Sequence, residues 1–172
     1  MRFGVLGPLE VTTAGGAPVR VPEAKVRLLL AVLLAHRGRA VSADRLVDAL
    51  WGDTPPTRPL GGLQTKVSLL RRAVGADLVT YRPAGYQLHA SADDVDAGRF
   101  AVLVARARAH DDPGARSALL GEALDLWRGP AFADVADAGV LAPAIRQLEE
   151  LRLVAVEEWA EARLEVAGGP GG

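Results

Sequence analysis

Residues 57–86 read TRPLGGLQTKVSLLRRAVGADLVTYRPAGY, and they predict a helix followed by a two-stranded hairpin. Apolar residues recur there at steps of three and four, the spacing that gives a helix one core-facing stripe. The stripe consists of Leu60, Leu63, Val67, Leu70 and Val74. Thr57 is the expected N-cap, Pro59 falls in the tolerant first turn, and Gly75 ends the helix. Strands over 78–81 and 86–89 are expected to pair around Arg82-Pro-Ala-Gly.

The face of this helix opposite the apolar stripe is partly cationic. At about 100° per residue, it carries Arg58, Gly61, Thr65, Leu69 and Arg72, with Gly62 and Ser68 beside it and Lys66 and Arg71 nearer the flanks. Arg82 adds a further cation at the tip of the hairpin. Such a surface suits an acidic partner, and the working hypothesis is a recognition helix and wing that read DNA.

Composition bounds the rest of the chain. Its 172 residues allow one large domain or two small ones, and 49% apolar with 24% charged residues is typical of a globular protein. The absence of cysteine excludes disulfides and thiolate metal sites. The N-terminus is a poor signal peptide, and no apolar run approaches the roughly 18 residues that span a bilayer. A cytoplasmic location without membrane association is therefore expected.

The net charge of −1 conceals a division. Residues 1–92 hold twelve basic and six acidic residues, a net charge of +6, whereas residues 93–172 hold eight and fifteen, a net charge of −7. This predicts two domains, 1–92 for a polyanion and 93–172 for a protein partner. The alternative that the two halves simply attract each other stays open, and the two explanations are compatible.

The elements before residue 57 complete the pattern of a winged helix. Short strands are expected in 1–7, 9–13 and 18–21, in one small antiparallel sheet. A helix is expected from about 22 to 36, and another from the N-cap Ser42 to Trp51. A Pro-Pro loop separates the second helix from the helix at 59–74. The prediction is an α+β fold: a winged helix-turn-helix followed by an all-α module.

After residue 93 the pattern is helical only. One helix is marked by Phe100, Leu103 and Val104, and a second runs up to Trp127. A third, over about 142–166, has an apolar stripe of Ile145, Leu148, Leu151, Val154, Val156 and Trp159. These helices resemble the start of a tetratricopeptide-like array, which appears short or truncated. Residues 168–172 are expected to be a disordered tail.

Several stretches together carry a specific resemblance. They are VLGPLEV, AKVRLLLAVLLAHRGRAVSADRLVDALWGDTPP, LQTKVSLLRRAVG, RPAGYQL, VDAGRF, ALDLWRGPAFADV and LEELRLVAVEE. The chain resembles the SARP family, actinomycete regulators that join an OmpR-type winged helix to a bacterial transcriptional activation domain. The resemblance spans nearly all of residues 1–167.

The resemblance implies a transcriptional activator of an antibiotic or other secondary-metabolite cluster. It implies side-by-side protomers that bind direct repeats in double-stranded DNA and recruit RNA polymerase, including its sigma factor. The helix at 59–74 would enter the major groove, with the hairpin on the backbone or in the minor groove. Lys25 and Arg27 would contact phosphates.

The residues themselves support a polyanion partner. Lys25, Arg27, Arg58, Lys66, Arg71, Arg72 and Arg82 together would neutralise roughly 4–6 phosphates. Arg58 and Thr65 are the best candidates for base edges, Ser68 lies beside them, and Leu69 would meet a thymine methyl group. Two alternatives stay open: Leu69 as an ordinary surface leucine, and Arg71 or Arg72 as a solvated face or part of an intramolecular ion pair.

Gly61 and Gly62 depart from the family, whose members usually carry polar residues there. Each costs roughly 1 kcal/mol relative to alanine in a helix. They favour an alternative function, a degenerate winged helix that regulates through protein contacts. An enzyme is disfavoured, because Ser42 and Ser68 lack a nucleophile elbow and the chain has no phosphate-binding glycine motif. No cofactor or metal is expected.

Overall fold

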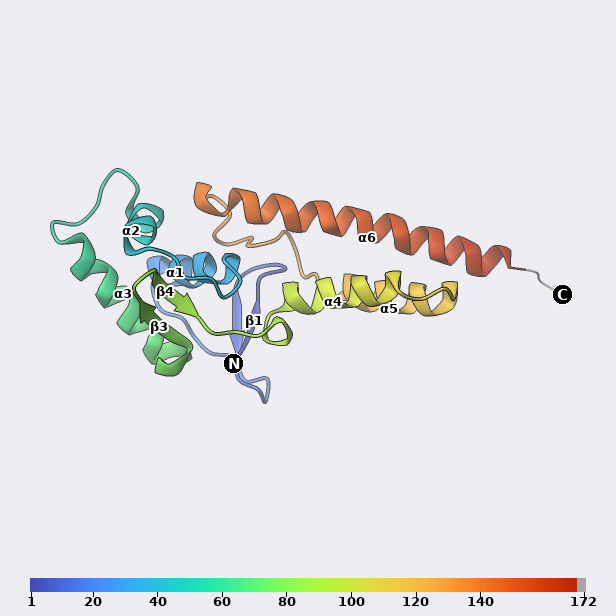
Figure 1. Cartoon of the computed structure of the whole chain (residues 1–172), viewed down its shortest axis with the longest axis horizontal. Helices are drawn as coiled ribbons and strands as arrows, with labels where there is room; N and C mark the ends of the chain where they lie inside the picture. Colours follow the sequence, from blue (N-terminus) through green and yellow to red (C-terminus); the bar gives the residue numbers. More distant parts are fainter. Residues whose placement is uncertain (170–172) are drawn as a thin grey trace.

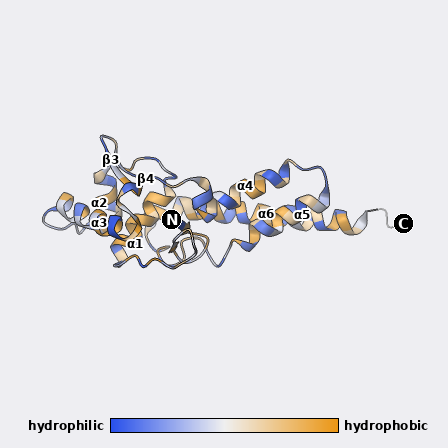
Figure 2. Cartoon of the chain, turned by 90° about the horizontal axis from the view of Figure 1, so that it is seen from below, coloured by the Kyte–Doolittle hydropathy of each residue, from blue (hydrophilic) through white to orange (hydrophobic). Residues whose placement is uncertain are grey.

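The computed structural model describes residues 1–169. The tail expected from residue 168 is wrong at Gly168, which ends the last helix, and residues 170–172 lie outside the described part. The elements follow one another as β1 (Arg2–Gly4), β2 (Glu10–Thr12), α1 (Ala24–Ala35), α2 (Ala43–Trp51), α3 (Pro59–Val74), β3 (Val79–Arg82), β4 (Gly85–Leu88), α4 (Asp96–Arg108), α5 (Pro113–Asp125) and α6 (Ala142–Gly168). The molecule is elongated: α1–α3 and the β3–β4 wing form one end, α4 and α5 lie toward the other, and α6 runs from beside α1 to that far end (Figures 1 and 2).

The first end is a winged helix, as predicted. α3 packs against both α1 and α2, and it buries Leu63, Val67, Leu70 and Val74. The hydroxyl of Ser42 accepts from the Arg45 amide at 3.2 Å and caps α2 as expected.

The wing is an antiparallel hairpin that is fixed at its base. Arg82 pairs with Gly85 across its two-residue turn. Tyr86 and Val41 exchange backbone hydrogen bonds of 2.8 and 2.9 Å, which anchor the wing to the chain before α2. Gly85 makes this approach possible: it has φ +129°, and a Cβ atom there would lie 2.0 Å from the Val41 carbonyl oxygen.

Three local predictions in this half are wrong. Arg58, not Thr57, occupies the N-cap position of α3, and no side chain caps the helix. Leu60 is 55% exposed, because the first turn of α3 lies at the edge of the domain beside the exposed loop. Residues 18–21 form only an isolated bridge between Thr12 and Pro18, next to which the Val19 amide donates to the Val11 carbonyl at 2.8 Å.

The other end contains three antiparallel helices. α5 packs against both α4 and α6, and Phe100, Leu103 and Val104 are buried as predicted. The predicted stripe of α6 is partly wrong: Val154 and Val156 are exposed, while Ala155 and Ala162 are buried. Alanines allow the helices to approach closely there, whereas Ile145, Leu148, Leu151 and Trp159 of the predicted stripe do pack on the core.

The N-terminal hairpin joins the two ends. Asp96 at the start of α4 is buried and accepts from the amides of Val5 at 2.8 Å and Leu6 at 3.1 Å. Burial raises the pKa of Asp96, while these amides, that of Ala97 and the charge of Arg128 act in the opposite direction. The Phe132 amide donates in turn to the Val5 carbonyl at 2.8 Å. One continuous hydrophobic core therefore runs through residues of both halves.

No helix within residues 1–169 combines the length and the apolar character needed to cross a bilayer.

Candidate nucleic-acid interface

The solvent face of α3 is built from small and polar side chains. The exposed residues are Leu60, Gly61, Gln64, Thr65, Ser68 and Arg72, preceded by Arg58. The Thr65 hydroxyl donates to the Gly61 carbonyl at 3.0 Å, so its oxygen remains able to accept a hydrogen bond from a ligand. The surface thus offers both donors and acceptors along nearly four turns of helix.

This exposed arc is rotated relative to the predicted one. The flank of α3 that carries Gly62, Lys66 and Leu69 is partly buried against the rest of the domain. Gln64 is therefore exposed to solvent. Gln64 was missed by the sequence analysis, although its position one residue before Thr65 and four before Ser68 placed it on the same side. An amide side chain can form a bidentate contact with adenine.

Two residues assigned to the interface are partly engaged elsewhere. The Lys66 ammonium lies 2.5 Å from a carboxylate oxygen of Glu23, which precedes α1. Leu69 is half-buried and packs against the hydrophobic core, so the expectation that it points outward is wrong. The reason is that α3 is covered on two sides, by α1 and by α2, and not along a single stripe.

Gly62 likewise belongs to the packed flank. A Cβ atom there would lie 3.0 Å from Cγ of Pro56 and 3.3 Å from the Trp51 ring, whereas one at Gly61 would meet only Cβ of Arg58 at 3.7 Å. Only Gly61 therefore removes a side chain from the solvent face. The prediction that Gly62 lies beside the solvent face is therefore wrong.

The wing adds a second group of side chains. Arg71 at the end of α3 donates from Nε to the Val79 carbonyl at 2.9 Å and so ties the helix to the base of the wing. Arg82 and Tyr81 are exposed, and the Tyr81 ring lies 5.0 Å from that of Tyr86. Tyr81, 65% exposed, is a second residue that the sequence analysis missed.

Lys25 and Arg27 are held by the protein itself. The Lys25 ammonium donates to the Leu50 carbonyl at the end of α2, at 2.7 Å. Arg27 donates to the Leu9 carbonyl at 2.8 Å and forms an ion pair with Asp134 in the segment before α6. Their geometry supports roles in holding the elements together.

Three further cations assigned to the interface stay on the surface. Arg58, Arg72 and Arg82 are exposed, and no acidic side chain of residues 1–169 lies within 4.0 Å of their charged groups. An exposed guanidinium without an acidic partner can donate to a phosphate in a bidentate manner.

Comparison with known proteins agrees with this geometry. Residues 17–88 match the family "Transcriptional regulatory protein, C terminal", and residues 95–168 match "Bacterial transcriptional activator domain". The transcriptional regulator RedD of Streptomyces coelicolor is 36% identical over 169 residues, which cover 92% of this chain and 48% of RedD. The regulatory protein EmbR of Mycobacterium tuberculosis is 35% identical over 94% of this chain and 44% of its own.

A solved structure extends the comparison to three dimensions. M. tuberculosis EmbR, in complex with a low-affinity phosphopeptide, superimposes with a TM-score of 0.91 at 31% identity over 96% of this chain and 46% of that chain. This confirms the predicted winged helix followed by a helical module. The chain spans about half the length of these relatives.

The fold and the two matched domains define a class of transcriptional regulators with an OmpR-type winged helix and an activator domain. The chain belongs to the SARP family within that class. Both matched domains are regulatory, which confirms the expectation that the chain is not an enzyme.

Proposed function

We propose that the chain binds double-stranded DNA through α3 and the wing. The observation that carries the proposal is the placement of Arg58, Arg72 and Arg82 around the polar arc of α3, exposed and without acidic partners. In this arrangement α3 lies in the major groove, where Gln64, Thr65 and Ser68 meet base edges. The arginines contact phosphates and set the orientation.

We further propose that the chain acts in the cytoplasm and that its binding to DNA activates a secondary-metabolite gene cluster. The family resemblance supports protomers that lie side by side on direct repeats. It also supports contacts of the acidic helical module with RNA polymerase and its sigma factor. Net charges of +6 and −7 in the two halves suit this division, because only the first half would be attracted to DNA.

A second candidate is a regulator that acts through protein contacts without specific DNA binding. It is favoured by Leu60 and Gly61, which put an exposed leucine and a missing side chain in the first turn of α3. The two candidates differ in whether the isolated protein binds DNA.

A fluorescence-anisotropy titration tests the proposal. The protein is titrated into labelled duplex from the promoter upstream of its own gene and into a shuffled duplex of equal composition. With three to five phosphate contacts, affinity should fall roughly 50- to 500-fold between about 50 and 200 mM salt. The promoter duplex should bind more tightly than the shuffled one. Absence of binding to either duplex at about 50 mM salt overturns the proposal and favours the second candidate.

A further inference from the structure

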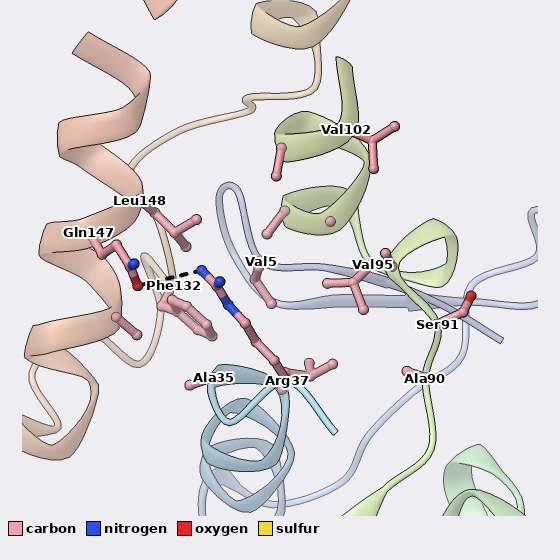
Figure 3. Close-up of a pocket in the computed structure, with 16 residues that line it drawn as sticks. Val5, Ala35, Arg37, Ala90, Ser91, Val95, Val102, Phe132, Gln147 and Leu148 are labelled. Carbon is pink, nitrogen blue, oxygen red and sulfur yellow. Dashed lines mark hydrogen bonds between the residues drawn. The ribbon is translucent and has the colours of Figure 1, made fainter. Parts of the chain in front are cut away.

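A cavity of about 320 Å³ lies where the two halves of the chain meet. Its walls come from the end of α1, the segment 90–95, the first half of α4 and the start of α6 (Figure 3). The floor is buried and apolar, formed by Val5, Leu34, Phe132 and Leu148. A volume just above 300 Å³ is at the small end of the range for ligand sites, so a compact molecule fits.

The cavity is open because its walls carry small side chains. Ala35, Ala101 and Ala144 face it from three different helices. Gly98 fixes the wall between α4 and the preceding segment, since a Cβ atom there would lie 2.2 Å from the Ala92 carbonyl oxygen. The absence of a side chain at Gly98 is thus what lets the segment 90–95 pack closely on α4.

Arg37 supplies the one charged group that lines the cavity. It follows α1 with φ +50°, and its side chain extends across the opening toward Gln147 on α6 (Figure 3). Its Nη2 lies 3.5 Å from Gln147 Oε1, at the limit of a hydrogen bond. No carboxylate of the described residues forms an ion pair with Arg37. A cation is thus placed over an apolar floor without a compensating anion.

We propose that this cavity binds a small organic carboxylate. The apolar body of the ligand lies on Leu34, Phe132 and Leu148. Its carboxylate accepts from the Arg37 guanidinium, and the Gln147 side chain supplies a second, neutral contact. Guanidinium and carboxylate are complementary in charge and in bidentate geometry, which selects an anion over a neutral molecule of the same shape. This site is separate from the DNA-binding surface and is independent of the proposed function.

Because the walls belong to both halves, a bound ligand stabilises the arrangement of the two ends. A ligand that binds only the folded chain raises its apparent stability in proportion to the logarithm of ligand concentration above Kd. Thermal unfolding thus gives a readout that requires neither DNA nor RNA polymerase.

The test uses the whole chain and two probes of matched shape, 1-naphthoate and the neutral 1-naphthalenemethanol. Titration followed by ¹H–¹⁵N correlation spectra should give saturable naphthoate binding, with the largest shifts at the amides of Gly98, Ala101 and Gln147. The melting temperature should rise with naphthoate concentration. Arg37→Met should weaken naphthoate binding by about tenfold or more, the loss of a charged hydrogen bond, and change naphthalenemethanol binding little.

Variants with a larger side chain in the cavity test whether the probes bind there. Ala144→Phe should abolish binding of both probes, and Ala101→Phe, at the exposed rim, does so with less risk to the core. Ala118→Phe on the exposed face of α5 and Arg39→Met, a neighbouring exposed arginine, are matched controls that should bind as the wild type does.

Two outcomes overturn the proposal. One is no saturation by naphthoate up to about 5 mM, above the millimolar affinity of a weak fragment. The other is unchanged binding to a folded Ala101→Phe or Arg37→Met variant.

Discussion

Arg27 of α1 and Asp134 of the segment before α6 form an ion pair that joins the winged helix to the helical module. Asp134 also accepts from the Leu9 amide at 2.8 Å, so one carboxylate holds α1 and the N-terminal hairpin together. Burial acts to raise the pKa of Asp134, but the Leu9 amide and the hydrogen bond and charge of Arg27 outweigh it, and the pKa is lowered.

This lowered pKa predicts how stability depends on pH. A carboxyl group whose pKa is lower in the folded state contributes stability above its unfolded pKa of about 3.9 and loses that contribution as pH falls through the folded pKa. Asp134→Asn should therefore lower the free energy of unfolding by about 1–2 kcal/mol at pH 7 and by less at about pH 3. Urea denaturation at both pH values measures the difference. Asp137→Asn, an exposed aspartate of the same segment, should change neither value; an equal loss in both variants would contradict the assignment.

The two glycines of α3 should respond differently to alanine. Gly61→Ala should raise the free energy of unfolding by about 1 kcal/mol, the difference in helix propensity at an open position. Gly62→Ala should gain less, because its methyl group would lie 3.0 Å from Pro56 and 3.3 Å from Trp51. Chemical denaturation of both variants provides the comparison. Equal gains would show that the flank of Gly62 is not packed.

Gly85 should be the least replaceable residue of the wing. Gly85→Ala brings a methyl group against the Val41 carbonyl and strains a residue with φ +129°, which should cost about 3 kcal/mol. The wing should then separate from α2, with loss of protection of the Val41 and Tyr86 amides in hydrogen exchange. Ala84→Gly in the exposed turn is the control. Normal protection in Gly85→Ala would rule out this account of the wing's attachment.

The exposed arginines should set the salt dependence of DNA binding. Arg72→Ala and Arg82→Ala should each weaken binding to all duplexes and reduce the slope of log affinity against log salt by about one. Arg106→Ala, an exposed arginine of α4, serves as the control for net charge. A reduction in slope equal to that of the control would mean that neither arginine contacts phosphate.

Gln64 should contribute to sequence preference. Gln64→Ala should cost about 1–3 kcal/mol on the promoter duplex and much less on shuffled DNA, because it removes a base contact and not a phosphate contact. Competition titrations with the two duplexes measure the ratio of affinities. Gln87→Ala, in the wing, should leave that ratio unchanged. An equal loss of affinity for both duplexes in the Gln64 variant would mean that Gln64 contacts the DNA backbone and not a base.

Much of the winged helix was predictable from local signals. The spacing of Leu63, Val67, Leu70 and Val74 identified the buried side of α3, and Ser42 identified the start of α2. These features depend on residues close in sequence, for which periodicity and capping are reliable guides.

The details of the candidate interface depended on distant neighbours. Lys66 forms an ion pair with Glu23, and Trp51 and Pro56 cover Gly62. The exposed arc of α3 is therefore rotated toward Gln64. The partner of Arg27 is 107 residues away in the sequence. No spacing rule relates such pairs, so the ion pair of Arg27 could not be predicted, and the family resemblance assigned Arg27 to phosphate.

The docking of the N-terminal hairpin bears on how such regulators can be recombined. Residues 2–12 precede both matched domains, yet Val5 and Leu6 are bound by Asp96 of α4 and lie in the common core. A chimera that exchanges winged helices at the 89–95 linker would leave Asp96 with amides from another protein's hairpin. Exchange should therefore preserve more stability when the first twelve residues travel with the helical module to which they bind, so the structural unit around Asp96 is discontinuous in the sequence.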